Sequence, residues 1–156
     1  LLSQPEIETI ELNHQAAPHE RHLQKALAKE ITIRVHSEAD YNDSVATGEF
    51  LFKAKADDIS SLDTAKFEKL LSGIDTFEIH KNELATPINI VNLLVEKAEV
   101  FPSNNEARKM ITGNALSVNK TKITDVNTLI DLSFFSNQTY LLISKGKKEN
   151  YLIKLI

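Results

Sequence analysis

A polar and basic stretch between Ser103 and Lys122 holds the residues of this 156-residue sequence best suited to bind a charged ligand. Ser103 is followed three residues later by Glu106, the spacing of a helix N-cap, and the first turn of a helix has unpaired backbone N–H groups. These groups and the positive end of the helix dipole attract phosphate, and basic side chains one turn later strengthen the attraction. The expected contact residues are Ser103, Asn104, Asn105, Arg108 and Lys109 on the helix, and Asn119, Lys120 and Lys122 on a following hairpin.

Such a surface is suited to follow an RNA backbone, mostly through phosphate and shape contacts rather than base reading. The alternative is a capped amphipathic helix beside a solvated turn. Two weaker basic groups are candidates for secondary RNA contacts, although a solvated helix face is the favoured explanation of the first group, because Glu30 and Glu38 lie nearby. These groups are Arg21, Lys25 and Lys29 on one helix face, and Lys145, Lys147 and Lys148 in a turn.

The sequence offers little for catalysis or metal binding. His19 and His22 lie one helical turn apart, but no neighbouring carboxylate or thiolate completes a set of three or four ligands. There is no Gly-x-Ser-x-Gly elbow, no glycine-rich phosphate loop, and no cysteine. We therefore expect no catalytic residue, no metal site and no bound cofactor. The histidines, interpreted as surface residues, are His14, His19, His22, His36 and His80.

Charge divides the chain into two parts. The net charge is −4, but residues 1–87 hold 9 Lys and Arg against 16 Asp and Glu, whereas residues 88–156 hold 9 against 6. This asymmetry predicts two modules, a helical domain over 1–85 and a second domain over 86–156 that is the better candidate for a polyanion contact. The absence of cysteine and of a leader fits a cytoplasmic protein, and the start at Leu1 without methionine suggests a piece of a longer chain.

The first module is predicted to be helical. Ser3 and Glu6 predict a capped helix that runs toward His14, with Pro5 in its first turn. A second helix over 19–35 has an apolar face that we expect to be buried. That face consists of Leu23, Leu27, Ile31 and Val35. The other predicted elements are helices over 37–52 and 63–73 and an extended segment over 76–80.

The second module is predicted to contain two helices packed on a small antiparallel sheet, which makes the chain α+β. Apolar spacing predicts a helix that starts at Pro87 and ends before Pro102, with its apolar face between residues 90 and 98. The next helix, over 103–112, ends where Gly113 is expected to be left-handed. Its buried residues are expected to be Ala107, Met110 and Ile111, which point Arg108 and Lys109 away from the core.

Alternation of apolar and polar residues predicts the strands of this sheet. Residues 116–118 pair with the segment around Ile123 across a turn at Asn119 and Lys120. Residues 139–144 and 150–156 form a second pair around a turn rich in lysine.

The stretch SNNEARKMITGNALSVNKTKITD resembles the S-four-like RNA-binding domain, which several kinds of RNA-binding protein share. Two positions depart from the pattern of that family. Asn104 stands where a basic residue is frequent, which puts one phosphate contact in question, and Lys120 stands where the turn glycine is usual, which implies a strained or altered turn. The matching residues are Glu106, Ala107, Arg108, Lys109, Gly113, Val118, Asn119 and Lys122.

The earlier segment NHQAAPHERHLQKALAKEITIRVHSEAD, followed by GEFLF, is similar to the helical region that follows the catalytic domain of bacterial tyrosyl-tRNA synthetases. By this resemblance the chain is a noncatalytic C-terminal region that grips tRNA(Tyr) through its anticodon and long variable arms. A missing N-terminal domain would attach tyrosine using ATP and Mg. The resemblance also implies a parent homodimer formed through the catalytic domain, and a monomeric fragment.

Two alternatives remain from the residues alone. The chain could belong to another protein with an S-four-like domain, such as a pseudouridine synthase or a ribosome-associated factor, although the segment over 19–36 argues against this. It could also be a structural adaptor whose exposed charges bind protein. Salt-dependent RNA binding would distinguish this hypothesis from the two RNA-binding hypotheses.

Overall fold

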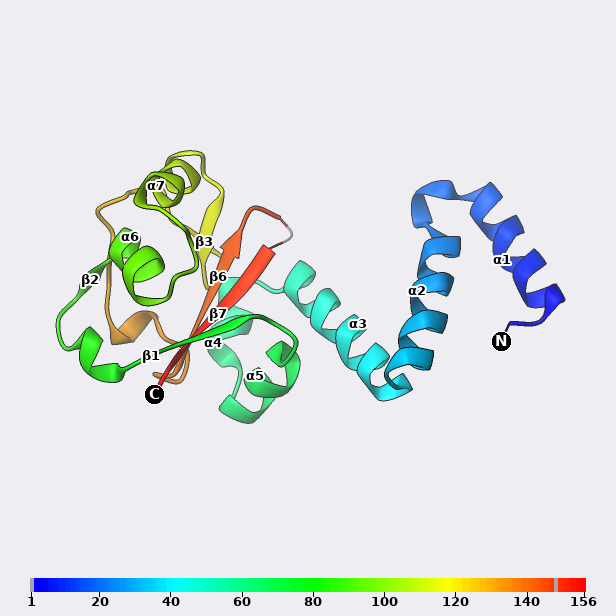
Figure 1. Cartoon of the computed structure of the whole chain (residues 1–156), viewed down its shortest axis with the longest axis horizontal. Coiled ribbons are helices and arrows are strands. Elements are labelled where there is room, and N and C mark those ends of the chain that lie inside the picture. The colour runs from blue at the N-terminus through cyan, green and yellow to red at the C-terminus, as the bar shows by residue number, and fades with distance from the viewer. Residues whose placement is uncertain (1, 148) are drawn as a thin grey trace. The chain divides into compact units, whose positions relative to one another are not determined.

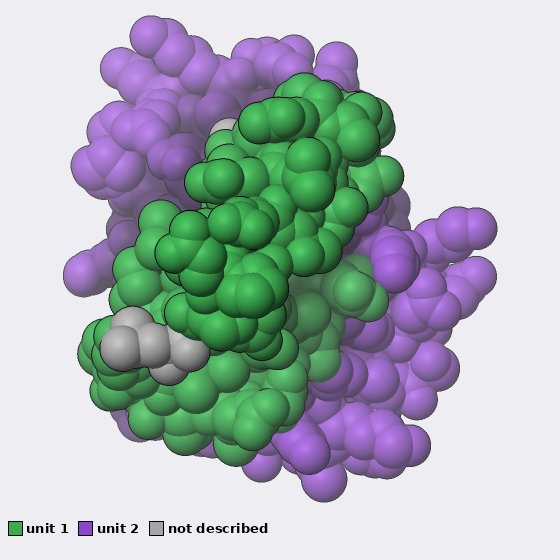
Figure 2. Space-filling view, turned by 90° about the vertical axis from the view of Figure 1, so that its right-hand side faces the viewer, with its two compact units in different colours: residues 1–49 green, residues 50–156 purple. Residues whose placement is uncertain are grey.

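A computed structural model describes residues 2–147 and 149–156 of the chain, and it contains two compact units. The first unit ends at Glu49 and the second runs from Phe50 to Ile156, as the two colours of Figure 2 show. The predicted division between residues 85 and 86 therefore differs from the division into compact units. Within the part of the chain that the structure describes, no helix is both long and apolar enough to span a membrane.

The first unit consists of helices, and the first and third α-helices start with the predicted capping pattern. Ser3 and Glu6 form the expected capping box, in which the backbone N–H of Ser3 donates to Glu6 Oε2 at 2.7 Å. Ser37 Oγ accepts from the backbone N–H of Asp40 at 3.1 Å and caps the third helix. The elements are α1 (Gln4–Ala16), a 3-10 turn (Pro18–Glu20), α2 (His22–Val35) and α3 (Glu38–Lys53), which continues into the second unit.

The prediction of a buried apolar face on α2 was wrong. Leu23 is 38% exposed and Val35 is 68% exposed, and none of the described residues of α1 or α2 is buried. The apolar side chains of α1 and α2 instead line a groove of about 510 Å³. The prediction assumed that this unit would cover its own amphipathic face, but two paired helices form one layer, and a core needs a second layer.

The second unit is built on a mixed five-stranded sheet with the order β1-β7-β6-β3-β4. The α+β class is confirmed, but β1 pairs with β7 in parallel, so the sheet is not purely antiparallel as predicted. Its strands are β1 (Thr76–Ile79), β3 (Leu116–Val118), β4 (Thr121–Lys122), β6 (Tyr140–Lys145) and β7 (Glu149–Leu155). A separate antiparallel pair joins β2 (Ile88–Asn89) to β5 (Leu129–Ile130).

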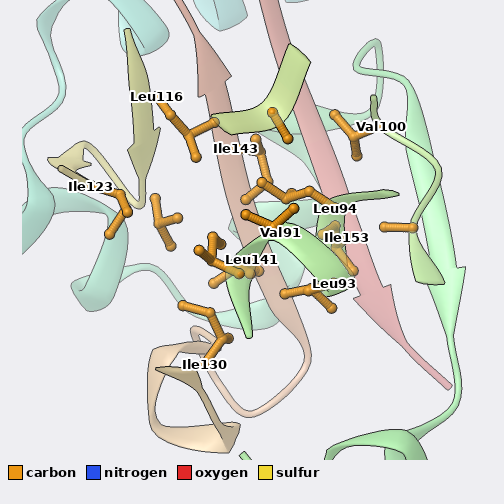
Figure 3. Close-up of a cluster of buried hydrophobic side chains, with 14 of the residues drawn as sticks. Val91, Leu93, Leu94, Val100, Leu116, Ile123, Ile130, Leu141, Ile143 and Ile153 are labelled. Atoms are coloured by element: carbon orange, nitrogen blue, oxygen red, sulfur yellow. The ribbon is translucent and has the colours of Figure 1, made fainter. Parts of the chain in front are cut away.

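One face of this sheet carries the larger core and the helices that follow residue 89 (Figure 1). The helix predicted from Pro87 starts later than expected, because residues 88–89 form strand β2. It is a short α-helix, α6 (Ile90–Asn92), that continues as a π-helical turn (Leu93–Lys97). α7 (Asn104–Thr112) lies over the same core, which also includes side chains of β3, β6 and β7. Figure 3 shows part of it, with Val91 and Leu94 near Ile143 and Ile153. Short 3-10 turns complete the unit at Lys81–Leu84 and Leu132–Phe134.

The opposite face of the sheet is covered by the segment that follows residue 49. A second core joins Ile59 of α4 (Ala56–Ser61) and Phe67 of α5 (Thr64–Leu71) to Tyr140, Leu142 and Leu152 of the sheet. Strand β6 is therefore buried on both faces, from Tyr140 to Ser144, and does not alternate as predicted. This packing explains why the segment that was assigned to the helical domain belongs to the second unit.

Tyr140 anchors α5 to this face. Its ring stacks on Phe67 with centroids 4.9 Å apart, and its hydroxyl donates a short hydrogen bond to Glu68 Oε1. Burial, and then the hydrogen bond to the Glu68 carboxylate, raises the pKa of Tyr140 to about 12.

This pKa predicts a loss of stability at high pH. The folded state holds the phenol neutral, so its contribution is complete below pH 10, the ordinary value, and is lost as the pH rises from 10 toward 12. The free energy of unfolding should fall over this range by roughly 2 kcal/mol more in the wild type than in Tyr140→Phe. Urea unfolding at several pH values measures both slopes, and equal slopes would contradict the prediction.

Candidate nucleic-acid interface

The N-terminus of α7 forms as the sequence predicts. Ser103 is the N-cap, and its Oγ accepts from the backbone N–H of Glu106 at 3.2 Å. Asn104 and Asn105 begin the helix with exposed side chains, and the first backbone N–H groups of a helix have no partner within it. This end of α7 is therefore open to a hydrogen-bond acceptor.

The body of α7 divides into a buried and a charged face. Ala107 and Ile111 are fully buried and Met110 is half-buried, whereas Arg108 and Lys109 are exposed, as predicted. Within residues 2–147 and 149–156, neither Arg108 nor Lys109 has an ion-pair partner. Both cations remain available to a ligand.

The helix ends differently from the prediction. Gly113 was expected to be left-handed, but its φ is −79°, and the left-handed residue is Asn114 with φ of 54°. A Cβ on Gly113 would lie 3.0 Å from the carbonyl oxygen of Lys109, so a larger residue here would require a small shift of the backbone. Asparagine tolerates the left-handed region better than most residues, which allows the turn to close one residue later.

An ion pair between Glu106 and Lys145 joins α7 to the sheet. Lys145 Nζ donates to Glu106 Oε1 at 2.9 Å and lies 3.6 Å from Glu149 Oε2. The same ammonium sits over the ring of Phe101, 5.1 Å from its centroid. The hydrogen bond to Glu106 raises the pKa of Lys145.

The Glu106–Lys145 ion pair changes two expectations from the sequence. The Glu106 carboxylate is held by Lys145, so it does not stand as an uncompensated negative charge beside the open helix end. Lys145 was a candidate RNA contact, but its side chain is only 22% exposed and already has carboxylate partners. It is placed to support α7 instead.

The β3–β4 hairpin turns at Asn119 and Lys120, as predicted. Their φ angles are 45° and 66°, and two successive left-handed residues make the kind of turn whose twist suits a two-residue hairpin. Asn119 Nδ2 donates to the Phe134 carbonyl at 2.6 Å, and its Oδ1 accepts from the Leu142 N–H at 2.9 Å. Both ends of the Asn119 amide are thus occupied within the fold, although it was expected to face RNA.

Lys120 also points into the protein. Its Nζ donates to the Leu51 carbonyl at 2.7 Å, and burial lowers the pKa of its ammonium. Lys120 was expected to contact RNA, but the packing of residues 50–74 on the sheet brings a carbonyl within its reach. Lys122, on β4, is exposed and is the cation that the hairpin presents to solvent.

The candidate secondary contacts are scattered. Arg21 has φ of 55° and precedes α2, so it does not continue the helical stripe of Lys25 and Lys29. Both lysines are exposed, and Lys29 Nζ lies 6.0 Å from the ring centroid of Tyr41. Lys147 is exposed in the β6–β7 turn. Lys148 lies outside the described residues.

Of the histidine pair His19 and His22, the second lies beside a carboxylate. His22 Nε2 lies 2.9 Å from Glu20 Oε2. Among the residues that the structure describes, no three or more His, Cys, Asp or Glu side chains gather into a possible metal site.

Sequence reasoning missed the supporting contacts behind this surface. Asn119 was recognised as a turn residue, and its tolerance of positive φ was readable, but its partners Phe134 and Leu142 lie 15 and 23 residues away. The Glu106–Lys145 pair spans 39 residues. Only the three-dimensional fold brings such groups together, so no local pattern marks them.

Comparison with known proteins identifies a matching family. Residues 66–153 match a family model described as the tyrosine–tRNA ligase SYY-like C-terminal domain. A tyrosine–tRNA ligase from Cytophaga hutchinsonii is 43% identical over 99% of this chain, and one from Parabacteroides distasonis is 42% identical over 97%. The chain spans 36% of the length of each of these relatives.

A solved structure, described as the solution structure of a tyrosyl-tRNA synthetase C-terminal domain, is also similar. It is 28% identical to this chain with a TM-score of 0.48, and the match covers 64% of this chain and 95% of that one.

The role of Asn119 can be separated from its backbone conformation. Asn119→Ala removes both amide hydrogen bonds and strains the left-handed turn, so it should lower the free energy of unfolding by roughly 3 kcal/mol. Asn114→Ala meets the same backbone requirement at an exposed side chain and should cost only about 1 kcal/mol. Urea unfolding compares the two variants, and equal losses would show that the amide bonds add nothing.

Proposed function

This chain belongs to the tyrosine–tRNA ligase family, and from that premise we propose that it is the noncatalytic region with which such a ligase holds tRNA(Tyr). It would grip the anticodon and long variable arms while the rest of the enzyme joins tyrosine to the tRNA. That reaction would use ATP and Mg bound elsewhere in the ligase. The enzyme would act in the cytoplasm.

One observation carries this proposal: α7 presents an open N-terminus and two unpaired cations on one exposed surface. The helix end can donate backbone N–H groups to a phosphate, and Arg108 and Lys109 follow within the next turn. Arginine can engage phosphate through two parallel hydrogen bonds. Glu106, the acidic residue of α7, is paired with Lys145. Its carboxylate therefore repels a bound phosphate less than a free carboxylate would.

The proposed contact set is smaller than the one expected from sequence. Asn119 and Lys120 would support the surface from behind, because their side chains are bonded within the fold. We propose that α7 and β4 supply the direct contacts. These are Ser103, Asn104, Asn105, Arg108, Lys109 and Lys122.

Phosphate contacts of this kind fix the position of the tRNA but do not read its sequence. Identity of the bound tRNA would then depend on the shape of the long variable arm and on contacts made by other parts of the ligase. Arg21, Lys25, Lys29 and Lys147 are proposed as secondary contacts.

The open groove of α1 and α2 suggests where the chain meets the remainder of the ligase. Its lining is mostly apolar, and the chain spans 36% of the length of its relatives. We propose that the preceding part of the ligase covers this groove, and that the complete enzyme is a homodimer through its catalytic domain. The isolated chain is proposed to be a monomer, and sedimentation equilibrium would reveal self-association through the groove as the contrary result.

The family match gives no support to a pseudouridine synthase or a ribosome-associated factor as the parent protein. A protein-binding adaptor is the remaining alternative. A test of RNA binding distinguishes it from the proposed function.

The charged face of α7 is tested by reversing its charge. Arg108→Glu with Lys109→Glu should weaken binding of a tRNA(Tyr) transcript by about tenfold or more, because each cation releases counterions from a phosphate. The slope of log affinity against log salt should become shallower by about two. Fluorescence anisotropy of labelled tRNA measures both quantities.

A matched control makes the same charge change on α5, which covers the other face of the sheet. Lys66→Glu with Lys69→Glu should change affinity by less than the α7 pair, since it removes the Lys66–Asp63 ion pair of α5 and alters the general field, but removes no proposed RNA contact. Equal losses in the two double variants, or unchanged binding by the α7 variant, would overturn the proposed surface. Thermal unfolding of each variant confirms that it is folded.

A further inference from the structure

Phe52 has an unusual exposure for an aromatic side chain. It is 88% exposed at the end of α3, and it is the only exposed Phe or Tyr among the residues that the structure describes. An aromatic ring in water loses the gain from burial that it would have in a core. A ring that stays outside an otherwise well-packed unit is available to a ligand.

The exposure of Phe52 follows from its position in a well-anchored helical turn. Its neighbours Phe50, Leu51 and Ala54 all pack against the core that Tyr140 and Phe67 form on the sheet. These neighbours occupy one side of the last turn of α3, so Phe52 is left on the other side. The backbone that carries the ring is held in place, which lowers the entropic cost of binding on it.

The turn that carries Phe52 is tied to the β3–β4 hairpin. Lys120 Nζ donates to the carbonyl of Leu51, the residue directly before Phe52. Two residues beyond Lys120, Lys122 is exposed on β4, and Lys55 is exposed three residues after Phe52. Of the acidic residues that follow, Asp58 is engaged with the backbone N–H of Lys55 at 2.8 Å.

An exposed ring on a turn that is bonded to a lysine-bearing hairpin matches the chemistry of a single-stranded RNA contact. Unpaired bases stack on aromatic side chains, while lysines hold the adjoining phosphates. Stacking accepts any base, because every base has a π face.

We infer that Phe52 is a stacking platform for an unpaired RNA base, on a turn that Lys120 ties to the hairpin of the proposed contact Lys122. The inference rests on the proposed tRNA-binding function and adds a second kind of contact to it. The β3–β4 hairpin links the two, because Lys120 fixes it to the turn of Phe52 while Lys122 faces the RNA. A loop or bulge nucleotide of the tRNA would be the ligand.

The chain contains no tryptophan, which allows a direct test. Phe52→Trp places one fluorophore at the platform, and stacking of a base on it should quench its emission when a tRNA(Tyr) transcript is added. Leu129→Trp is the matched control, since Leu129 is 56% exposed on β5, a strand of the separate two-stranded sheet. Anisotropy of labelled tRNA measures total binding in the same titrations.

The expected result is saturable quenching in Phe52→Trp, at the tRNA concentration where anisotropy shows binding, with little change in Leu129→Trp. Phe52→Ala should lose about fivefold or more in affinity, in keeping with one stacked base. A short single-stranded RNA should quench Phe52→Trp more strongly than a duplex of equal length.

The contrary results are distinct. Binding by anisotropy without quenching, or equal quenching in both tryptophan variants, would overturn the stacking site and leave the proposed function standing. No binding of tRNA by the wild-type chain would overturn both. If Phe52→Ala keeps its RNA affinity but loses a self-association seen in sedimentation, Phe52 is a protein contact and the inference is wrong.

Discussion

The second unit depends on the burial of strand β6 on both of its faces. Leu141 and Ile143 enter the core beneath α6 and α7, whereas Tyr140 and Leu142 enter the core beneath α4 and α5. A strand this apolar requires a cover on each side, and burial of large apolar side chains is the main favourable term in folding. The segment from residue 50 to 74 is therefore an integral part of the second unit. Its packing also brings the Leu51 carbonyl to Lys120 and holds the hairpin in place.

Local features of the fold were predictable from the sequence. The cap at Ser103, the amphipathic face of α7 and the turn at Asn119 and Lys120 each rest on residues close together in the chain, and all formed as expected. The parallel pairing of β1 with β7 was not predictable, because it joins residues more than 70 positions apart and leaves no local pattern. The apolar face of α2 illustrates the opposite error, since periodicity indicates which residues need a cover but does not say which part of a protein provides it.

In the candidate site too, local features were predictable from the sequence and long-range contacts were not. Exposed cations on α7 were predictable from helical spacing, because burial of Ala107 and Ile111 sets the direction of their neighbours. Which lysines stay free was not predictable, since Lys145 finds Glu106 only through the sheet. A basic residue counts toward a binding surface only when the fold leaves its charge without a partner. Here the fold pairs the one carboxylate at the helix start and leaves the cations of the next turn open.

We propose that tRNA(Tyr) lies across the open end of α7 and reaches Lys122 of β4. The most direct measurement is the change in backbone amide chemical shifts of the isotope-labelled chain on addition of a tRNA(Tyr) transcript. We expect the largest changes at Asn104, Asn105 and Lys122, with the amides of α5 nearly unchanged. Largest changes on α5, with α7 and β4 unaffected at saturation, would contradict it.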